Sequence, residues 1–380
     1  MESRASLALV GVIASLGLSC TDDNDRTGDQ TTCIGPNELV GQPACGAAAY
    51  QEDVSACLHA ATDYEPRQLT ADHNGWPACI ADDDAWHLIG AGPPAAVSRS
   101  LAFEAMATKL WLNPCRPSPA DFLSARDDYS TPEGLASRVA RRQDISYPEV
   151  PGDDKFACGN QGIPEAYPDR CAGPAKLKPL IDAAFQRGSE AVEPLSQAAR
   201  IEAALLWFFY LSMSSEIWTC GFNNINDCDS AAGYYTQITP RDAPAGLAVY
   251  VAAVGPETHQ RIYDALLAAR CWRDIDQAMP ATPAFVGYYD RAQAQLAKAA
   301  LRGVALILRQ RVGEILCAGG EARAAHVAFV EVLGGLLDHA ASGIAGGAAA
   351  SLRVFTASPT ADPSAVAAAQ AAIDTIFTCP

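Results

Sequence analysis

The stretch that decides the fold is residues 201–230, IEAALLWFFYLSMSSEIWTCGFNNINDCDS. At the 100° per residue of an α-helix, five of its side chains fall within one narrow stripe: Glu202, Leu205, Phe209, Met213 and Glu216. Apolar residues at this spacing predict a helix that faces a hydrophobic core. The same stripe carries a carboxylate at each end, so both carboxylates are expected to point inward or towards the ends of the core.

Downstream of this helix the sequence continues with helical periods. From about residue 175 it is rich in Ala, Leu and Val, and alternating strand-like runs are nearly absent. The predicted helices are 175–188, 194–219, 230–237, 256–277, 283–318, 321–345 and 363–377. Residues 173–380 are therefore expected to form an antiparallel helical bundle.

Upstream, residues 33–172 form a different region, which is loop-rich, proline-rich and Cys-rich. Its short predicted helices are 47–61, 94–112, 118–129 and 131–142. The last two open with SPAD and TPEG, where Ser or Thr caps the helix and Pro takes the first helical position. A Pro/Gly/Asp-rich stretch at 148–174 marks the expected boundary. The predicted fold class is all-α: a disulfide-stapled helical bundle with a Cys-rich N-terminal region.

Composition excludes several classes of protein. Of the 380 residues 49% are hydrophobic and 19% charged, which is inconsistent with intrinsic disorder. There are 44 acidic against 27 basic side chains, a formal charge of −17 that repels nucleic-acid phosphates. Nucleic acid is therefore not an expected partner.

The N-terminus has the features of a targeting segment. Residues 5–18, ASLALVGVIASLGL, are apolar but too short to span a bilayer permanently, so residues 1–19 are predicted to be a signal peptide. Residues 16–20, LGLSC, resemble a bacterial lipobox, which predicts lipidation of Cys20 and a membrane anchor. Residues 20–32 then form a polar tether. Gly17 stands where a branched aliphatic residue is usual, and a plain secretory signal is the alternative. Either way the chain is expected in the cell envelope, on the periplasmic or cell-surface side.

The cysteine count agrees with this compartment. Thirteen cysteines less the lipidated Cys20 leave twelve, enough for six disulfides in an oxidising environment. Cys220 and Cys228 flank a short loop and are a plausible local pair. No CxxC or Cys-His zinc spacing occurs.

The inward carboxylates are the first candidates for a functional site. Glu202 and Glu216 are 14 residues apart, about 21 Å along a helix, so they cannot share one ion. A carboxylate in an apolar seam must pair with a cation, be protonated or bind a metal, since an isolated buried charge is costly. A salt bridge to arginine and a metal site built across facing helices are the two alternatives.

Further candidate ligands lie on the helix predicted at 256–277. We take His259, Asp264 and Asp274 as candidate metal ligands together with Glu202 and Glu216. His259 and Asp264 project about 140° apart, so other helices would have to complete a site.

Two arginines lie on the strongly apolar helix at 301–316. Arg302 and Arg309 are seven residues apart on one face, and arginine tolerates such surroundings because it pairs with carboxylates. Arg309 is expected to pair with Glu202, Asp264 or Asp274. A pocket for an anionic substrate is the alternative.

Weaker signals come from the oxygen-rich loop 223–229, from His326 and His339, and from residues 73–87 with their histidines and adjacent aspartates. No HExxH, GxSxG, P-loop or GxGxxG motif is present, so the chain is predicted not to be an enzyme.

The helix IEAALLWFFYLSMSSEIWTC, the following DCDSAAGYY and the later THQRIYDALLAARCWRD resemble the low-iron-inducible periplasmic proteins of iron assimilation in green algae, which have bacterial lipoprotein relatives. This resemblance implies an extracytoplasmic, non-enzymatic helical protein that helps iron uptake. More distantly, the chain is similar to imelysin, whose HxxE motif precedes an apolar LLWG-like run. Glu202 matches the Glu of that motif, whereas Ala199 stands at the His position, a departure that puts an imelysin-type metal site in doubt.

Together these features predict an envelope lipoprotein that binds a metal ion, above all iron, for uptake or storage. The alternative is a structural lipoprotein, or one that binds an envelope protein partner, whose charges form internal ion pairs without a metal. Pairing of Glu202 with Arg302 or Arg309 would favour the alternative. Convergence of three or more carboxylates or imidazoles without arginine would favour the metal.

Overall fold

The computed structural model describes residues 52, 63, 64, 85–113, 115–150, 157–221, 226–278, 283–342 and 346–379, and for 272–278, 283–286 and 342 the backbone only. The predicted signal peptide, Cys20, the tether, the helix at 47–61, most of the segment 73–87 and the side chain of Asp274 lie outside the described residues. Within the described ranges the chain forms helices and no strand, which confirms the all-α prediction.

The helices run in chain order as follows: α1 Ala95–Lys109, α2 Pro119–Tyr129, α3 Leu135–Val139, α4 Ile163–Ala166, α5 Lys178–Ser189, α6 Pro194–Cys220, α7 Asn226–Thr236, α8 Leu247–Val254, α9 Pro256–Ala278, α10 Pro283–Cys317, α11 Gly320–Ser342, α12 Gly347–Ala357 and α13 Pro363–Ile376. A 3-10 turn at Ala157–Gly159 precedes α4, and a π-helical turn at Gly173–Leu177 leads into α5.

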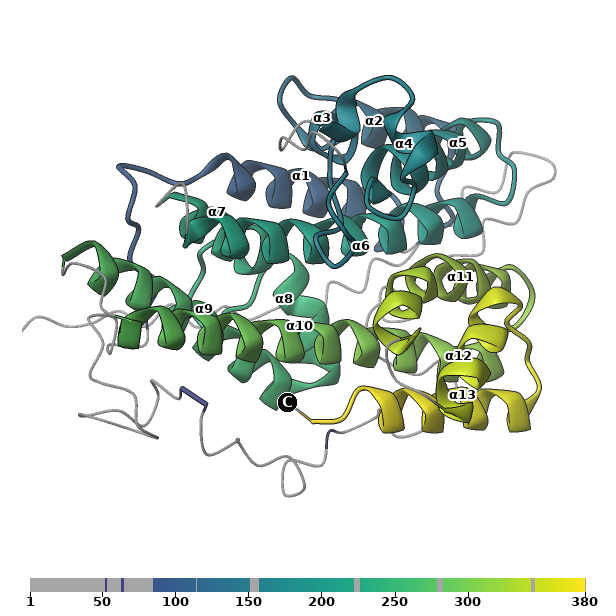
Figure 1. The fold of residues 1–380 in the computed structure, drawn as a ribbon. Helices are drawn as coiled ribbons and strands as arrows, with labels where there is room; N and C mark the ends of the chain where they lie inside the picture. Colours follow the sequence, from purple (N-terminus) through teal and green to yellow (C-terminus); the bar gives the residue numbers. More distant parts are fainter. Residues whose placement is uncertain are drawn as a thin grey trace, which may run out of the picture. The chain divides into compact units, whose positions relative to one another are not determined.

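Helix α6 is the central element. It packs against α5, α7 and α11, while α9 packs along α10, and α12 and α13 pair beside α11 (Figure 1). Nearly every face of α6 is buried, because Ala, Leu and aromatic residues surround its axis. The rings of Phe208 and Phe209 lie between the rings of neighbouring helices: Phe103 of α1 is 5.1 Å from Phe209, and Tyr234 of α7 is 5.9 Å from Phe208. Burial of this apolar surface is the main stabilising term of the bundle.

The hydrophobic core continues across the boundary expected near residue 172. Helix α1 packs against α7, and α2 packs against α5. Buried residues from both sides, such as Phe122 and Phe185, belong to one cluster. The described helices before and after residue 172 therefore share a core.

Of the two helix starts predicted from Ser-Pro and Thr-Pro pairs, the structure confirms one and contradicts the other. The SPAD start is confirmed: the Ser118 hydroxyl accepts a hydrogen bond from the Asp121 backbone N–H at 3.3 Å, and the Asp121 carboxylate accepts one from the Ser118 N–H at 2.8 Å, which completes a capping box. The TPEG start is wrong. Residues 131–134 form a turn closed by a Gly134 N–H to Thr131 carbonyl bond, and the short α3 begins only at Leu135.

Three described helices are absent from the sequence prediction: the four-residue α4, α8 and α12. Helix α8 has eight residues, LAVYVAAV, too few to show a helical period. The helix expected at 321–345 ends at Ser342, and α12 begins after Gly346, whose φ of 139° lies in the region that glycine favours.

Disulfides join neighbouring elements. Cys220 and Cys228 are bonded, as predicted, and tie the end of α6 to the start of α7; Cys158 and Cys171 are also bonded. Cys271, Cys317 and Cys379 are disulfide-bonded as well. Cys115 differs from the expectation of twelve bonded cysteines, because its thiol is free.

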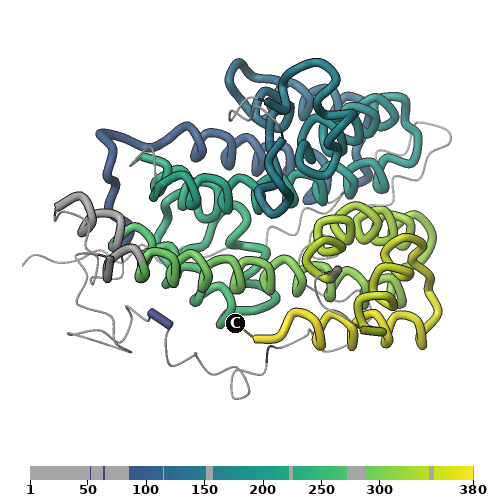
Figure 2. Tube along the Cα trace, in the orientation of Figure 1, coloured from purple at the N-terminus to yellow at the C-terminus, as the bar shows by residue number. Residues whose placement is uncertain are grey.

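The end of the chain returns to the bundle. After α13 it runs back beside α10 (Figure 2), where the Arg302 guanidinium donates a hydrogen bond to the Phe377 carbonyl. Helix α11 is the one described helix long and apolar enough to cross a membrane, but it packs against α6 and α10 and 61% of its most apolar stretch is buried, as in the core helix of a globular domain.

Candidate functional site

The first inward carboxylate lies in an ion pair at the centre of the bundle. Glu202 of α6 is fully buried, and its Oε1 accepts a hydrogen bond of 2.8 Å from Nη2 of Arg311 of α10. The Arg311 side chain is 5% exposed. A buried carboxylate next to a buried guanidinium is stabilised by a charge-assisted hydrogen bond that an isolated charge would lack.

Arg311 connects Glu202 to two further titratable groups. Its Nη1 lies 3.6 Å from Oε2 of Glu314, and that oxygen lies 3.2 Å from Nδ1 of His326 on α11. The guanidinium also lies 4.6 Å from the ring centroid of Phe329. We call Glu202, Arg311, Glu314 and His326 the Arg311 network; it brings together α6, α10 and α11.

Burial controls the charges in the Arg311 network. It raises the pKa of Glu202 to about 7, against the opposing attraction of Arg311, and it raises the pKa of Glu314 for the same reason. Burial, followed by the positive charge of Arg311, lowers the pKa of His326 to about 3, so the imidazole is neutral at physiological pH. The network therefore has one permanent cation and two carboxyls whose pKa values burial raises.

The second inward carboxylate has its own arginine. Glu216, near the end of α6, accepts a hydrogen bond of 3.2 Å from Nη2 of Arg142, which follows α3. The Arg142 guanidinium also lies over the rings of Phe208 and Tyr234, each 5.7 Å from the centroid. Glu202 and Glu216 thus have separate partners, as their spacing along the helix requires.

The candidates on α9 are also paired. Asp264 is fully buried, and its Oδ1 lies 2.7 Å from Nη2 of Arg241. Nε2 of His259 lies 2.9 Å from the Arg241 carbonyl, and its Nδ1 lies 2.8 Å from the Tyr235 hydroxyl. Because a carbonyl only accepts, Nε2 carries the proton, and Nδ1 accepts from Tyr235. The nitrogen that could bind a metal is already used in a hydrogen bond.

The prediction that Arg309 pairs with Glu202 or Asp264 is wrong, whereas its pairing with Asp274 is not tested, because that side chain lies outside the described residues. Arg309 donates from Nε to both oxygens of Asp374 on α13, at 2.9 and 3.0 Å. Glu202 pairs instead with Arg311, two residues further along α10 and therefore on a different face of the helix. The Arg302 guanidinium lies 3.7 Å from Glu52 Oε1. The neighbours of Arg302 and Arg309 are thus carboxylates and a carbonyl of the chain itself, which leaves little support for an anion pocket there.

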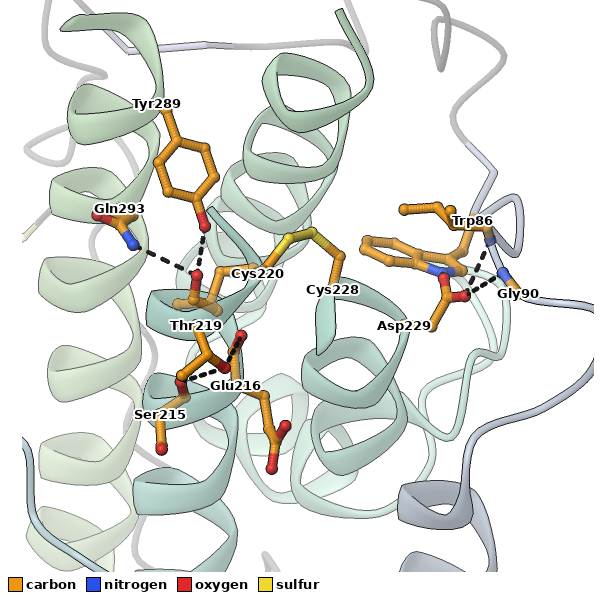
Figure 3. The surroundings of a disulfide bond; sticks show 12 residues. Trp86, Gly90, Ser215, Glu216, Thr219, Cys220, Cys228, Asp229, Tyr289 and Gln293 are labelled. Carbon is orange, nitrogen blue, oxygen red and sulfur yellow. Dashed lines mark hydrogen bonds between the residues drawn. A yellow bond between two sulfur atoms is a disulfide. The ribbon is translucent and has the colours of Figure 1, made fainter. Parts of the chain in front are cut away.

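The weaker sequence signals have structural partners. Asp229, at the end of the oxygen-rich loop, accepts hydrogen bonds from the Trp86 indole at 3.0 Å and from the Ile89 and Gly90 backbone N–H groups at 2.9 Å (Figure 3). Both carboxylate oxygens of Asp229 therefore already accept hydrogen bonds from the chain, where a calcium ion would need them as ligands. His339 stacks on Tyr147 with ring centroids 3.9 Å apart.

The same view shows how the α6–α7 junction is held. The Cys220–Cys228 disulfide joins the two helices, and Tyr289 and Gln293 of α10 both point towards the end of α6 (Figure 3). Both side chains donate hydrogen bonds to the Ile217 carbonyl. The last turn of α6 is therefore anchored by a covalent bond and by two donors from another helix.

The structure does not bring together the four candidate metal ligands whose side chains it describes, Glu202, Glu216, His259 and Asp264. Glu202, Glu216 and Asp264 each pair with an arginine, and His259 is bonded to Tyr235 and to a carbonyl. Among the residues whose side chains are described, no group of three or more His, Cys, Asp and Glu is arranged to hold a metal ion. Sequence reasoning missed Arg311 and Glu314, although their i, i+3 spacing on an apolar helix was a visible signal of a buried ion pair.

No protein-family model, curated protein or solved structure matches this chain.

Proposed function

We propose that this chain is a non-enzymatic lipoprotein of the cell envelope, with a helical bundle that has a structural or protein-interaction role. The observation that carries the proposal is the pairing of inward carboxylates with arginines from other elements: Glu202 with Arg311, Glu216 with Arg142 and Asp264 with Arg241. Ion pairs of this kind place each of these carboxylates next to a cation of the chain itself, which supports a structural role for the charges. The partner in such a role is another envelope protein.

The location rests on the sequence and on the disulfides. Apolar residues 5–18 followed by Cys20 support export and lipidation, and the bonded Cys158–Cys171 and Cys220–Cys228 pairs fit an oxidising compartment. The direct test is expression of the full chain in a bacterial host with labelled palmitate. We expect label in the protein and recovery in the membrane fraction, both lost in Cys20→Ala. Unlabelled, soluble wild-type protein would overturn the anchor.

Iron binding for uptake or storage is the second candidate, and one observation favours it. Within the Arg311 network, Glu202 Oε2 is buried without a hydrogen bond, and Glu314 Oε2 and His326 Nδ1 are buried with each other as neighbours at 3.2 Å but without a well-aligned hydrogen bond. Two carboxylate oxygens and an imidazole nitrogen are suitable donors for iron. The fit is poor, however, because the Arg311 guanidinium lies among them, and a cation would have to displace it.

Thermal unfolding separates the two candidates. A metal that binds the folded state raises the unfolding midpoint, and a chelator lowers it. With internal ion pairs we expect the same midpoint in EDTA and in buffer with ferrous or ferric iron. A midpoint that rises with iron, and that no longer responds to iron in Glu202→Gln, would support iron binding instead.

A further inference from the structure

Four arginines converge where α1, α3 and α7 meet. Arg99 of α1 donates from Nη1 to the Tyr234 hydroxyl of α7 at 3.2 Å, and the Arg142 guanidinium lies 5.7 Å from the centroid of the same ring. The Arg141 backbone N–H donates to the Arg138 carbonyl at 3.2 Å, so these two arginines are neighbours on one turn. Burial, then the positive charges of Arg99 and Arg141, lower the pKa of Arg138, while the Glu216 carboxylate opposes this shift. We call Arg99, Arg138, Arg141 and Arg142 the Arg138 cluster.

The negative charge available to the Arg138 cluster is small. The Glu216 carboxylate binds Arg142, and the exposed Glu133 carboxylate lies 3.5 Å from Arg141. Arg99 donates from Nε and Nη2 to the Glu133 backbone carbonyl, a neutral acceptor. Arg99, Arg138 and Arg142 thus carry three positive charges, and Glu216 is the one carboxylate that pairs with them among the described contacts, on a chain whose net charge is −17. Such a local excess of positive charge attracts anions.

Donors in the cluster remain unused. The half-buried Arg138 makes no hydrogen bond or ion pair with any residue that the structure describes, and its Nε is buried. The Arg142 side chain is 9% exposed, and its Nε also has no partner. A buried N–H without an acceptor is costly, whereas the planar guanidinium donates in pairs to the oxygens of carboxylates and phosphates. Both features point to an oxyanion as the missing acceptor.

We propose that the Arg138 cluster binds the carboxylate or phosphate group of a small anionic molecule. Arg138 donates to its oxygens, and Nε of Arg142 adds a second donor from the buried side. Glu216 competes with the anion for Arg142 and so limits the affinity. This site is not the pocket considered at Arg302 and Arg309, because those two arginines lie on α10.

Calorimetric titration of the full chain with inorganic phosphate and with citrate tests the proposal. We expect saturable binding of at least one of them at about one per chain. Arg138→Gln should weaken it about tenfold or more, because a charge-assisted pair of hydrogen bonds is lost. Arg138→Lys should weaken binding by an intermediate factor, since lysine keeps the positive charge but not the planar guanidinium that donates two parallel hydrogen bonds. Arg353→Gln is the matched control, because it removes the same charge from an exposed position on α12 and should leave binding unchanged.

A second variant keeps the test independent of the folding of Arg138→Gln. Glu216→Gln removes the competing carboxylate and should strengthen anion binding about threefold or more, whereas a purely structural cluster would show no gain. Equal weakening by Arg138→Gln and Arg353→Gln, or no saturable binding of either anion, would overturn the proposal. Binding to phosphatidylglycerol vesicles, but to neither free anion, would overturn the small-molecule assignment in favour of a lipid headgroup.

Discussion

Arg311 of α10 and Glu202 of α6 form a hydrogen-bonded ion pair of 2.8 Å inside the bundle, between residues 109 positions apart in the chain. Neither side chain is more than 5% exposed. The pair therefore does not behave like a surface salt bridge, because the removal of one member leaves the other buried without its partner and out of contact with water.

Loss of Arg311 should be strongly destabilising. Arg311→Met leaves Glu202 and Glu314 without their cation, and we expect the free energy of unfolding in urea to fall by about 3 to 5 kcal/mol. Arg353→Met removes an arginine from the exposed pair with Asp338 and should cost less than about 1 kcal/mol. In a Glu202→Gln background Arg311→Met should cost less than in the wild type. Equal costs in the two backgrounds would show that the charges are not coupled.

The Arg311 network also makes stability depend on pH in two opposing ways. The pKa of Glu202 rises from 4.5 to about 7 on folding, so between pH 4.5 and 6.5 the folded protein retains a proton that the unfolded chain releases. Stability due to Glu202 therefore falls as the pH rises. The pKa of His326 falls from 6.5 to about 3, so in the same range the unfolded chain binds a proton that the folded protein does not, and this contribution rises with pH.

Single variants should separate the two contributions. When the pH rises from 4.5 to 6.5, the free energy of unfolding of Glu202→Gln should increase by about 2 kcal/mol more than that of the wild type. The reason is that the variant lacks the opposing contribution of Glu202 and keeps that of His326. For His326→Asn the same change in the free energy of unfolding should be lower than in the wild type by a similar amount, because the contribution of Glu202 remains and that of His326 is removed. Urea unfolding of the three proteins at both pH values measures these differences, and carboxyls outside the Arg311 network affect all three alike. Parallel curves for the three proteins would contradict the assignment.

The sequence was sufficient for the fold class and for most helices. Long apolar periods with Pro near their starts predict α6, α9, α10 and α13, and the SPAD capping box predicts α2, because these signals are local. Helix α8 was missed because eight residues do not resolve a period. The TPEG signal predicts a helix start, but the same Thr-Pro pair also fits a turn. The structure has a turn, in which residue 133 adopts a φ of 54°.

The partners of the buried charges could not be predicted to the same extent. The stripe on α6 placed Glu202 in the core correctly, but its cation comes from a helix 109 residues away. Arg309 and Arg311 differ by two positions, about 200° around α10, and only the packing of α10 decides which of them faces α6. Likewise Arg241, which pairs with Asp264, lies in a loop without a helical period.

The Cys220–Cys228 disulfide should make a measurable contribution to stability. It closes a loop with a sequence separation of 8, so Cys220→Ala/Cys228→Ala should lower the free energy of unfolding by about 2 to 3 kcal/mol. Cys158→Ala/Cys171→Ala, with a separation of 13, should cost slightly more. Differential scanning calorimetry without reductant gives both values. A double variant as stable as the wild type would show that Tyr289 and Gln293 alone hold the α6–α7 junction.

Cys115 should be chemically distinct from the bonded cysteines. Its thiol is free and half-buried, so a maleimide reagent should label it in the folded, unreduced protein. Peptide mapping by mass spectrometry should find the label on Cys115 and none on Cys158, Cys171, Cys220 or Cys228. A disulfide-linked peptide that contains Cys115 would contradict the free thiol and restore the expectation of twelve bonded cysteines.

The measurement that most directly tests whether the inward carboxylates are neutralised by arginine is elemental analysis by mass spectrometry. The untagged mature protein would be equilibrated in a buffer with ferrous, ferric, copper and calcium ions and then freed of excess metal. Internal ion pairs predict a folded protein with no stoichiometric metal. About one iron per chain, lost in Glu202→Ala and kept when the exposed Glu321 is replaced by Ala, would show instead that the carboxylate on α6 is a ligand.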